Sequence, residues 1–379
     1  MRKSAAMGAA VLLILCLCAC AAAEKVITLS FAGNCTLGSD ESTRNFAESF
    51  EKAVEANGYG YFFANWKDLF SRDDCTVVGC ECVFNNTRDG ENLNRAIRYR
   101  APEENVQIFQ EGSVEAVALA NDHTGDYSAA GLENTKRVLD EAGIGWFRDD
   151  SIWIFRKDGI AIAFAAIDYG IYQRNGAAIR DKLLEMRETG EIQAAVLLVH
   201  QGNEFAVKHS REQEDYAADF IENAKVDLVI TQHPHVLQGI RILNNRTAVY
   251  SLGNFVFGGQ SRVNKANGAD SLYMMAVQAR LYFTDEGEYK GQQITLYPGH
   301  SSGTDPKNNY QPVRVVAEQA AAVMRAVQAD TETELPEVWT DEYGLAYAVM
   351  DYLPADDSGA QMPRGEPEPA QPRPTRNNR

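Results

Sequence analysis

The chain has 379 residues, which is enough for one large domain or two of ordinary size. Its hydrophobic content of 45% and charged content of 23% are those of a soluble globular protein. The formal net charge of −17 argues against nucleic acid as a partner, because phosphate backbones are bound by basic surfaces.

Residues 1–23 are typical of an export signal peptide. Arg2 and Lys3 form a basic start, and the apolar run at residues 9–19 is too short to span a bilayer comfortably. Alanines 21–23 supply a cleavage site, whereas residues 17–20 also resemble a bacterial lipoprotein box with Cys20 as the lipidated residue. We therefore expect an exported protein, extracellular or attached to the cell envelope. Whether it is secreted or lipid-anchored stays open.

The mature chain alternates predicted strands and helices. Mostly apolar runs predict strands at residues 25–31, 75–79, 114–120, 195–199 and 226–230. Helical spacing or composition predicts helices at residues 42–57, 128–142, 212–224 and 316–327. Turn signals at Asp158-Gly159 and Asn244-Asn245 predict two hairpins, and apolar runs at 272–283 and 293–297 complete a β-rich second half.

Composition divides the mature chain into three parts. We expect an α/β domain over residues 25–311, a C-terminal helical extension over residues 312–353, and a disordered tail over residues 354–379 that is rich in proline and charge. Four cysteines fall inside the domain: Cys35, Cys75, Cys80 and Cys82. Their spacing does not complete a zinc site, and buried thiols and one disulfide remain equal alternatives.

Residues that can bind metals follow five of the predicted strands. They are Asn34, Glu81, the pair Asp122 and His123, His200, and the pair His233 and His235. Because ligands bind at the carboxyl ends of strands in an open α/β sheet, we expect these side chains to form one site. Pro234 fixes its own φ, so we expect the last two histidines to lie on an extended, stiff segment.

Four motifs in this order resemble the CapA family, the bacterial poly-γ-glutamate capsule synthesis proteins related to calcineurin-like metallophosphoesterases. They are ANDHTGD (residues 120–126), VHQGNE (199–204), HPHV (233–236) and YSLGNFVF (250–257). The resemblance covers residues 26–311 and implies a four-layer α/β/β/α sandwich with two metals at the strand ends. The metal ligands that it implies are Asn34, Glu81, Asp122, His200, His233 and His235.

Three residues depart from the family pattern. Asn34 stands where the family has aspartate, Asp122 where it has asparagine, and Gly79 where it has asparagine. The first two exchange one carboxylate for another and keep the ligand charge unchanged, which could preserve a pair of divalent ions. The alternative is that Asn34, a neutral ligand, leaves one metal position poorly filled.

Histidine and carboxylate ligands suit Mn, Fe or Zn better than Ca or Mg. Glu81 is the expected bridging carboxylate, and two such ions would activate a water for attack on a phosphorus or carbonyl centre. We expect His123 to act as general acid, oriented by Asp126. Arg100 and Glu204 are candidates for substrate binding, each weighed against an ordinary surface role.

These features predict an exported, CapA-like, metal-dependent hydrolase that acts in the synthesis of an envelope polymer, either poly-γ-glutamate or a polysaccharide. Its expected substrate is a phosphoester or an amide-type polyanion, and membrane-bound capsule synthesis machinery is an expected partner. The alternative is a non-catalytic assembly or export factor that holds the polymer in the same cleft.

Overall fold

The computed structural model describes residues 24–258 and 262–355. The predicted signal at residues 1–23 and residues 356–379 of the predicted tail lie outside the described residues. Within the described ranges, every helix is too short or too polar to cross a bilayer.

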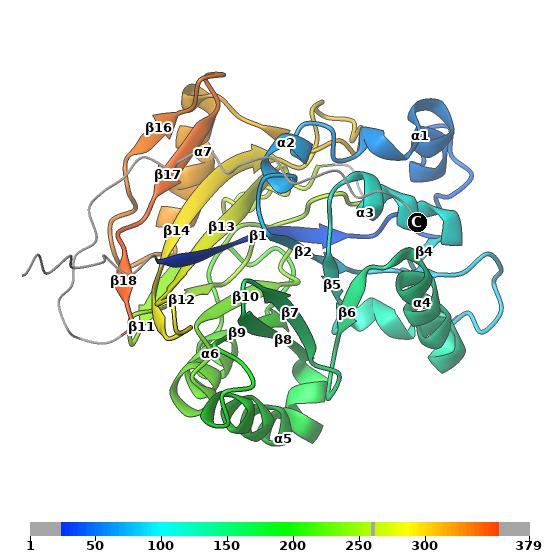
Figure 1. Cartoon of the computed structure of the whole chain (residues 1–379). Helices are drawn as coiled ribbons and strands as arrows, with labels where there is room; N and C mark the ends of the chain where they lie inside the picture. The colour runs from blue at the N-terminus through cyan, green and yellow to red at the C-terminus, as the bar shows by residue number, and fades with distance from the viewer. Residues whose placement is uncertain (1–23, 259–261, 356–379) are drawn as a thin grey trace, which may run out of the picture.

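Two large sheets make up the centre of the molecule (Figure 1). The larger runs in the order β16-β17-β14-β13-β1-β2-β5-β6, and β15 and β18 also pair with β14. Its strands are β1 (Lys25–Cys35), β2 (Cys75–Cys80), β5 (Ala116–Ala118), β6 (Gly145–Phe147), β13 (Tyr273–Phe283), β14 (Tyr289–His300), β15 (Val313–Arg314), β16 (Val338–Thr340), β17 (Ala346–Val349) and β18 (Leu353–Pro354).

The smaller sheet has the order β11-β12-β10-β9-β8-β7. Its strands are β7 (Trp153–Lys157), β8 (Ile160–Asp168), β9 (Ala194–His200), β10 (Leu228–Gln232), β11 (Ile240–Leu243) and β12 (Arg246–Val249). A separate two-stranded sheet joins β3 (Val83–Phe84) to β4 (Arg100–Ala101). The predicted hairpin joins β7 to β8, and positive φ angles of 50° at Asp158 and 77° at Gly159 suit its tight turn.

The described α-helices are α1 (Phe50–Asn57), α2 (Lys67–Phe70), α3 (Gln107–Glu111), α4 (Ser128–Ala142), α5 (Tyr169–Glu188), α6 (Arg211–Ala224) and α7 (Ala317–Gln328). Three short 3₁₀ helices are η1 (Tyr59–Tyr61), η2 (Glu103–Val106) and η3 (Asp122–Gly125). α4 ends as predicted at Gly143, which adopts the left-handed conformation. α6 begins with a capping box, in which Ser210 and Gln213 satisfy each other's backbone N–H groups.

Apolar side chains form a core on each face of the larger sheet. The core between the sheets includes Leu29 of β1 and Phe164 of β8, and it reaches α5 and α6 through Leu183 and Phe220. The core on the opposite face is rich in aromatic side chains and includes residues of α1, α2, α3 and α4. Figure 1 shows α5 and α6 on the far side of the smaller sheet. The layers are therefore helix, sheet, sheet, helix, which confirms the predicted α/β/β/α sandwich.

Some predicted elements differ in the structure. The helix expected at residues 42–57 begins only at Phe50, where the side chain of Ser49 accepts a hydrogen bond from the backbone of Lys52. The extension at residues 312–353 contains the predicted helix α7, but it also supplies β15, β16 and β17, which join the larger sheet. It therefore completes the domain through strands, and the interpretation of it as helical is only partly right.

The carboxyl ends of the parallel strands meet where the two sheets approach each other. β1, β2 and β5 are parallel in the larger sheet, and β8, β9 and β10 are parallel in the smaller one. At this junction the side-chain amide of Gln232 donates to the carbonyl of Ala32, with an N–O distance of 3.0 Å. The fold therefore brings the ends of the five strands that precede the candidate ligands, β1, β2, β5, β9 and β10, to one place.

Candidate metal centre

Three predicted ligands converge from three separate strand exits. His200 ends β9, His233 follows β10, and Asp122 follows β5 as the first residue of η3. Nε2 of His200 lies 3.0 Å from Oδ1 of Asp122 and 3.0 Å from Nδ1 of His233. Two ligand atoms bound to one ion at about 2.1 Å stand roughly 3.0–3.4 Å apart at bond angles of about 90–110°. The third pair, Oδ1 of Asp122 and Nδ1 of His233, is 3.8 Å apart, which corresponds to a wider angle of roughly 130° at the same bond length. The three atoms can therefore surround a single metal ion.

The backbone of His233-Pro234-His235 differs from the prediction. His233 has a φ of 104° and His235 a φ of 59°, so the segment bends twice where an extended conformation was expected. Positive φ is costly for residues with a side chain, and such strain is often kept at functional sites. The bends lead to different partners for the two rings, since His233 contacts His200 whereas His235 contacts Asn254. The prediction of an extended segment is therefore wrong.

A second group of ligands lies around Glu81. Atoms of Glu81, Asp122 and His123 lie within 4.8 Å of one another, as do those of Asp122, His200 and His233, so Asp122 belongs to both groups. Nε2 of His235 lies 3.9 Å from Oε1 of Glu81. Asp122 is shared between the two groups, and the expected bridging role of Glu81 stays a prediction.

Unpartnered buried oxygens supply the test of whether metals fit. Neither carboxylate oxygen of Glu81 accepts a hydrogen bond within the described structure, and the residue is 1% exposed. The side-chain oxygen of Asn34 is likewise buried without a partner among the described residues. Buried oxygens without partners are costly, and a cation would satisfy them. The histidine and carboxylate donors suit divalent transition metals, and the expected identity of the metal as Mn, Fe or Zn stays a prediction.

Burial and neighbouring charges shift the pKa values of the candidate ligands Glu81, His233 and His235. Burial, together with the charges of Asp122, Glu204 and Asp126, raises the pKa of Glu81 well above its ordinary value. Burial lowers the pKa of His233 to about 3, with a further contribution from His200, and burial lowers the pKa of His235 to about 4. Both imidazoles are therefore neutral at neutral pH, which is the form that binds metals.

Asp122 behaves in the opposite way to Glu81. Burial acts to raise the pKa of Asp122, but the hydrogen bond from His200 and the neighbouring histidines outweigh it and hold this pKa below its ordinary value. Asp122 is therefore ionised and ready to bind a cation without first losing a proton.

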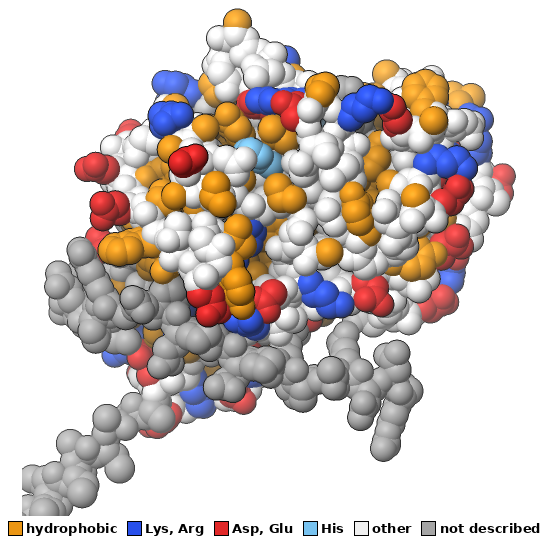
Figure 2. Space-filling model, turned by 90° about the horizontal axis from the view of Figure 1, so that it is seen from above, with side chains coloured by type: hydrophobic (Ala, Val, Ile, Leu, Met, Phe, Trp, Pro, Cys, Tyr) orange, Lys and Arg blue, Asp and Glu red, His pale blue; other side chains and the backbone are white. Residues whose placement is uncertain are grey.

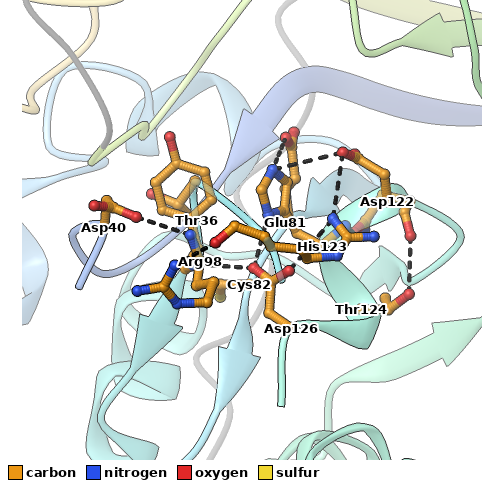
Figure 3. A network of polar contacts seen from close by, with 12 residues as sticks. Thr36, Asp40, Glu81, Cys82, Arg98, Asp122, His123, Thr124 and Asp126 are labelled. Atoms are coloured by element: carbon orange, nitrogen blue, oxygen red, sulfur yellow. Dashed lines mark hydrogen bonds and ion pairs between the residues drawn. The ribbon is translucent and has the colours of Figure 1, made fainter. Parts of the chain in front are cut away.

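His123 is held as predicted. Its Nδ1 lies 2.7 Å from Oδ2 of Asp126, a fully buried carboxylate that also accepts the backbone N–H of Tyr99 at 2.8 Å. Its Nε2 then faces the ligands, 3.8 Å from Oε1 of Glu81 and 3.7 Å from Oδ2 of Asp122. Figure 3 shows the ring of His123 among these carboxylates. Asp126 thus fixes the ring, and the free nitrogen of His123 points to the cluster.

Asn254 is a site residue to which the sequence analysis assigned no role. Its side-chain oxygen lies 2.8 Å from Nδ1 of His235, and its backbone forms a bridge with Asn34. Gly33 permits this close approach, because a Cβ there would lie 1.9 Å from the carbonyl oxygen of Gly253. The position of Asn254 inside the motif at residues 250–257 was the signal in the sequence that it belongs to the site. Nothing in the motif showed which histidine Asn254 contacts.

The structure explains why Gly79 departs from the family pattern. A Cβ on Gly79 would lie 2.0 Å from the side-chain oxygen of Gln232, which is buried and donates to Ala32 across the sheet junction. A side chain at this position would require Gln232 to move, because Gln232 occupies the space beside Gly79.

The two predicted substrate-binding residues lie in different surroundings. Arg100 is buried and belongs to an ionic network, because its Nε pairs with Glu41 at 2.5 Å and its Nη1 donates to the carbonyl of Asn85 at 3.1 Å. These contacts engage Arg100 with Glu41 and Asn85, and its role in substrate binding stays a prediction. Glu204 is exposed in the loop after β9, and its charge acts on Glu81. Its role in substrate binding stays a prediction.

The four cysteines of the domain are buried free thiols. The sulfurs of Cys80 and Cys82, which flank Glu81, lie 3.9 Å apart. Burial raises the pKa of Cys35, so its neutral thiol form is favoured. The sequence left buried thiols and one disulfide as alternatives, and the structure has buried thiols.

The sequence is similar to those of known bacterial proteins. Residues 28–259 match the model of the family described as bacterial capsule synthesis protein PGA_cap. The chain is 24% identical over 255 residues to the PGA biosynthesis protein CapA of Bacillus subtilis, covering 62% of this chain and 64% of that protein. It is also 24% identical over 255 residues to the capsule biosynthesis protein CapA of Bacillus anthracis, covering 61% and 60%. The match thus spans less than two thirds of each relative.

Among solved structures, similar chains include a hypothetical protein from Thermus thermophilus, with a TM-score of 0.43 and 16% identity over 72% of this chain and 99% of that one. The calcineurin-like phosphoesterase YfkN from Bacillus subtilis has a TM-score of 0.45 and 11% identity, over 80% and 98% of the two chains. The family model covers more than half of the sequence, including the strand exits that carry the candidate ligands. The chain therefore belongs to the bacterial capsule synthesis protein family.

Proposed function

We propose that this protein is an exported, metal-dependent hydrolase that acts in capsule polymer synthesis at the cell envelope. The observation that carries the proposal is the pair of ligand groups that share Asp122, together with the unpartnered oxygens of Glu81 in the second group. The relatives from Bacillus are named for capsule or PGA biosynthesis, which supports an envelope polymer such as poly-γ-glutamate or a polysaccharide as the context. Membrane-bound capsule synthesis machinery is the proposed partner.

Each side chain has a distinct task in this proposal. Asp122, His200 and His233 would hold one divalent ion, and Glu81, Asp122, Asn34 and His235 would surround a second. When bound, two such ions polarise a phosphoryl or carbonyl oxygen and lower the pKa of a water. His123 would give a proton from the nitrogen that faces the cluster to the leaving group, while Asp126 holds the ring in place.

Metal analysis of the mature chain is the test. After loading with Mn²⁺ and removal of excess ion, the protein should retain metal and hydrolyse bis(p-nitrophenyl) phosphate. His233→Ala should lose most of the bound metal and the turnover, because it removes one of three converging ligands. His300→Ala, which removes a histidine that stacks on Tyr273 in the sheet, is the matched control and should keep both. An absence of bound metal under metal-replete conditions would refute the catalytic proposal.

A second candidate is a non-catalytic factor that holds the polymer in the same cleft for assembly or export. Asn34 favours it, because a neutral amide at a ligand position binds a cation more weakly than a carboxylate. Asn34→Asp separates the two: a rise in metal content and turnover supports a hydrolase with one weak position. Binding of poly-γ-glutamate by both proteins, with turnover by neither, supports the holding factor.

A further inference from the structure

An arginine outside the predicted site points to substrate recognition. Residues 86–98 form the excursion between β3 and β4, and hydrogen bonds fasten it at several points. The backbone N–H of Asn92 donates to the carbonyl of Asp126 at 2.8 Å. The backbone N–H of Arg98 donates to Asp40 at 2.8 Å, and its Nε donates to Glu91 at 2.7 Å. The excursion is therefore held beside the cluster before any ligand arrives, and Figure 3 shows Arg98 between Asp40 and the cluster.

Arg95 lies on this excursion and faces the ligands. Its Nη1 is 3.4 Å from Oδ1 of Asp126 and 3.8 Å from Oδ2 of Asp122, and its side chain is 35% exposed. Both distances exceed those of good hydrogen bonds. By contrast, Nε of Arg88 donates to Glu91 at 2.7 Å, and Nε of Arg100 donates to Glu41 at 2.5 Å.

The guanidinium of Arg95 has unused donors. Its side chain donates no hydrogen bond to any of the residues that the structure describes, although a guanidinium carries five N–H groups in a planar fork. Among the lysines and arginines that the structure describes, Arg95 is the one with a charged nitrogen within 4 Å of Asp122 or Asp126. Arg95 therefore places a partly exposed guanidinium at the edge of the site. Its backbone is held by the fastened excursion, and its side-chain N–H groups donate to none of the described residues.

An anionic substrate needs such a cation here. The cluster itself contributes three carboxylates, Glu204 lies close enough to act on Glu81, and the whole chain carries a net charge of −17. In Figure 2 acidic and basic side chains are interspersed around one face, and the coloured residues there form no continuous basic surface. Local positive charge must therefore come from bound metal and from side chains such as Arg95.

We propose that Arg95 binds an oxyanion of the substrate with its planar fork, next to the metal ligands. The group it takes is a phosphoryl or carboxylate group, since both present two oxygens that match a guanidinium. A phosphoryl group would belong to the reacting centre, whereas a carboxylate would belong to a neighbouring unit of an acidic polymer. The inference rests on the proposed function only in taking the substrate to be an anion at this site.

A merely structural role makes different predictions. If Arg95 served only to neutralise Asp126, its removal would disturb His123 and lower turnover without changing the affinity for anions. The test therefore measures binding. Isothermal titration with inorganic phosphate and with a short γ-linked glutamate oligomer is run on wild type, Arg95→Ala and Arg95→Lys, with and without Mn²⁺. Arg72→Ala is the control, because that side chain is 33% exposed and pairs with Asp68 on α2.

We expect Arg95→Ala to weaken binding of at least one probe tenfold or more, with Arg95→Lys intermediate and Arg72→Ala unchanged. Metal content should be equal in all four proteins. A loss confined to phosphate assigns the contact to a phosphoryl group, and a loss confined to the oligomer assigns it to a polymer carboxylate. Wild-type affinity of Arg95→Ala for both probes, or failure of the wild type to bind either, would overturn the inference. If the wild type bound the probes but showed no turnover, that result would count against the proposed hydrolase activity only, and the inference about Arg95 would stand.

Discussion

Replacing Asp122 with asparagine should change the stability of the metal-loaded protein and leave that of the metal-free protein nearly unchanged. Asp122 belongs to both ligand groups, so its charge would act on both ions. In the absence of metal, its loss removes one hydrogen bond with His200, worth about 1 kcal/mol. The same change removes like-charge repulsion with Glu81, which compensates in part.

The expected loss of metal affinity in Asp122→Asn is estimated from the number of ligands that hold an ion. A four-ligand transition-metal site is worth roughly 10–16 kcal/mol, or about 3 kcal/mol per ligand, which corresponds to a loss of about 100-fold in affinity. At a free ion concentration of 100 times the wild-type Kd, binding stabilises the fold by about 2.7 kcal/mol, and this falls to about 0.4 kcal/mol in the variant. For a domain of this size, the metal-induced rise in Tm should fall from about 5 °C to about 1 °C.

Thermal unfolding with and without Mn²⁺, combined with measured metal content, checks this expectation. Asp68→Asn, which removes a carboxylate on α2 that is 65% exposed, should keep the full metal-induced rise. A chelator should return the wild type to the metal-free Tm. If Asp122→Asn kept the wild-type rise in Tm and its metal content, the assignment of Asp122 as the shared ligand would be wrong.

Two further substitutions test the surroundings of the site and the core. Asp126→Asn turns two charge-assisted hydrogen bonds, from His123 and from the backbone of Tyr99, into neutral ones, at about 1 kcal/mol each. Turnover of bis(p-nitrophenyl) phosphate should therefore fall about thirty-fold while metal content is kept, and loss of the metal would contradict this role. Asp227→Ala removes a fully buried carboxylate and leaves Arg187 without its partner, and urea unfolding should show a loss of about 3–5 kcal/mol. The control, Asp219→Ala, removes a more exposed partner and should cost about 0–1 kcal/mol; equal losses would contradict the burial argument.

Local patterns in the sequence were sufficient for most of the elements that carry the site. The helix over residues 128–142 was predicted with the bounds that α4 has, because apolar periodicity and Gly143 are local signals. The strands before Asn34, His200 and His233 were predicted because apolar runs of this length are typical of buried strands. Their shared edge followed from the rule that parallel strands present ligands at their carboxyl ends.

The sequence did not predict elements that have weak local patterns or that depend on pairing with residues far away in the chain. The helix α5 was not predicted, because its first half contains Gly170 and Gly176 and is largely polar. It buries its apolar side chains, Ile179 and Leu183 among them, only because the smaller sheet lies beneath it. The strands β16 and β17 were missed for a similar reason, since they are short and β17 is defined by pairing with the distant β14.

The sequence by itself determined the fold class and the six candidate metal ligands, because both follow from local periodicity and from a family pattern in one dimension. Tertiary structure decided which of these side chains face each other. It placed Asp122 in both candidate ligand groups, paired the buried Arg100 with Glu41, and brought Arg95 to the cluster. Two arginines only five positions apart differ in this way because Arg95 lies on the excursion that is fastened to Asp40 and Asp126, whereas Arg100 lies on β4.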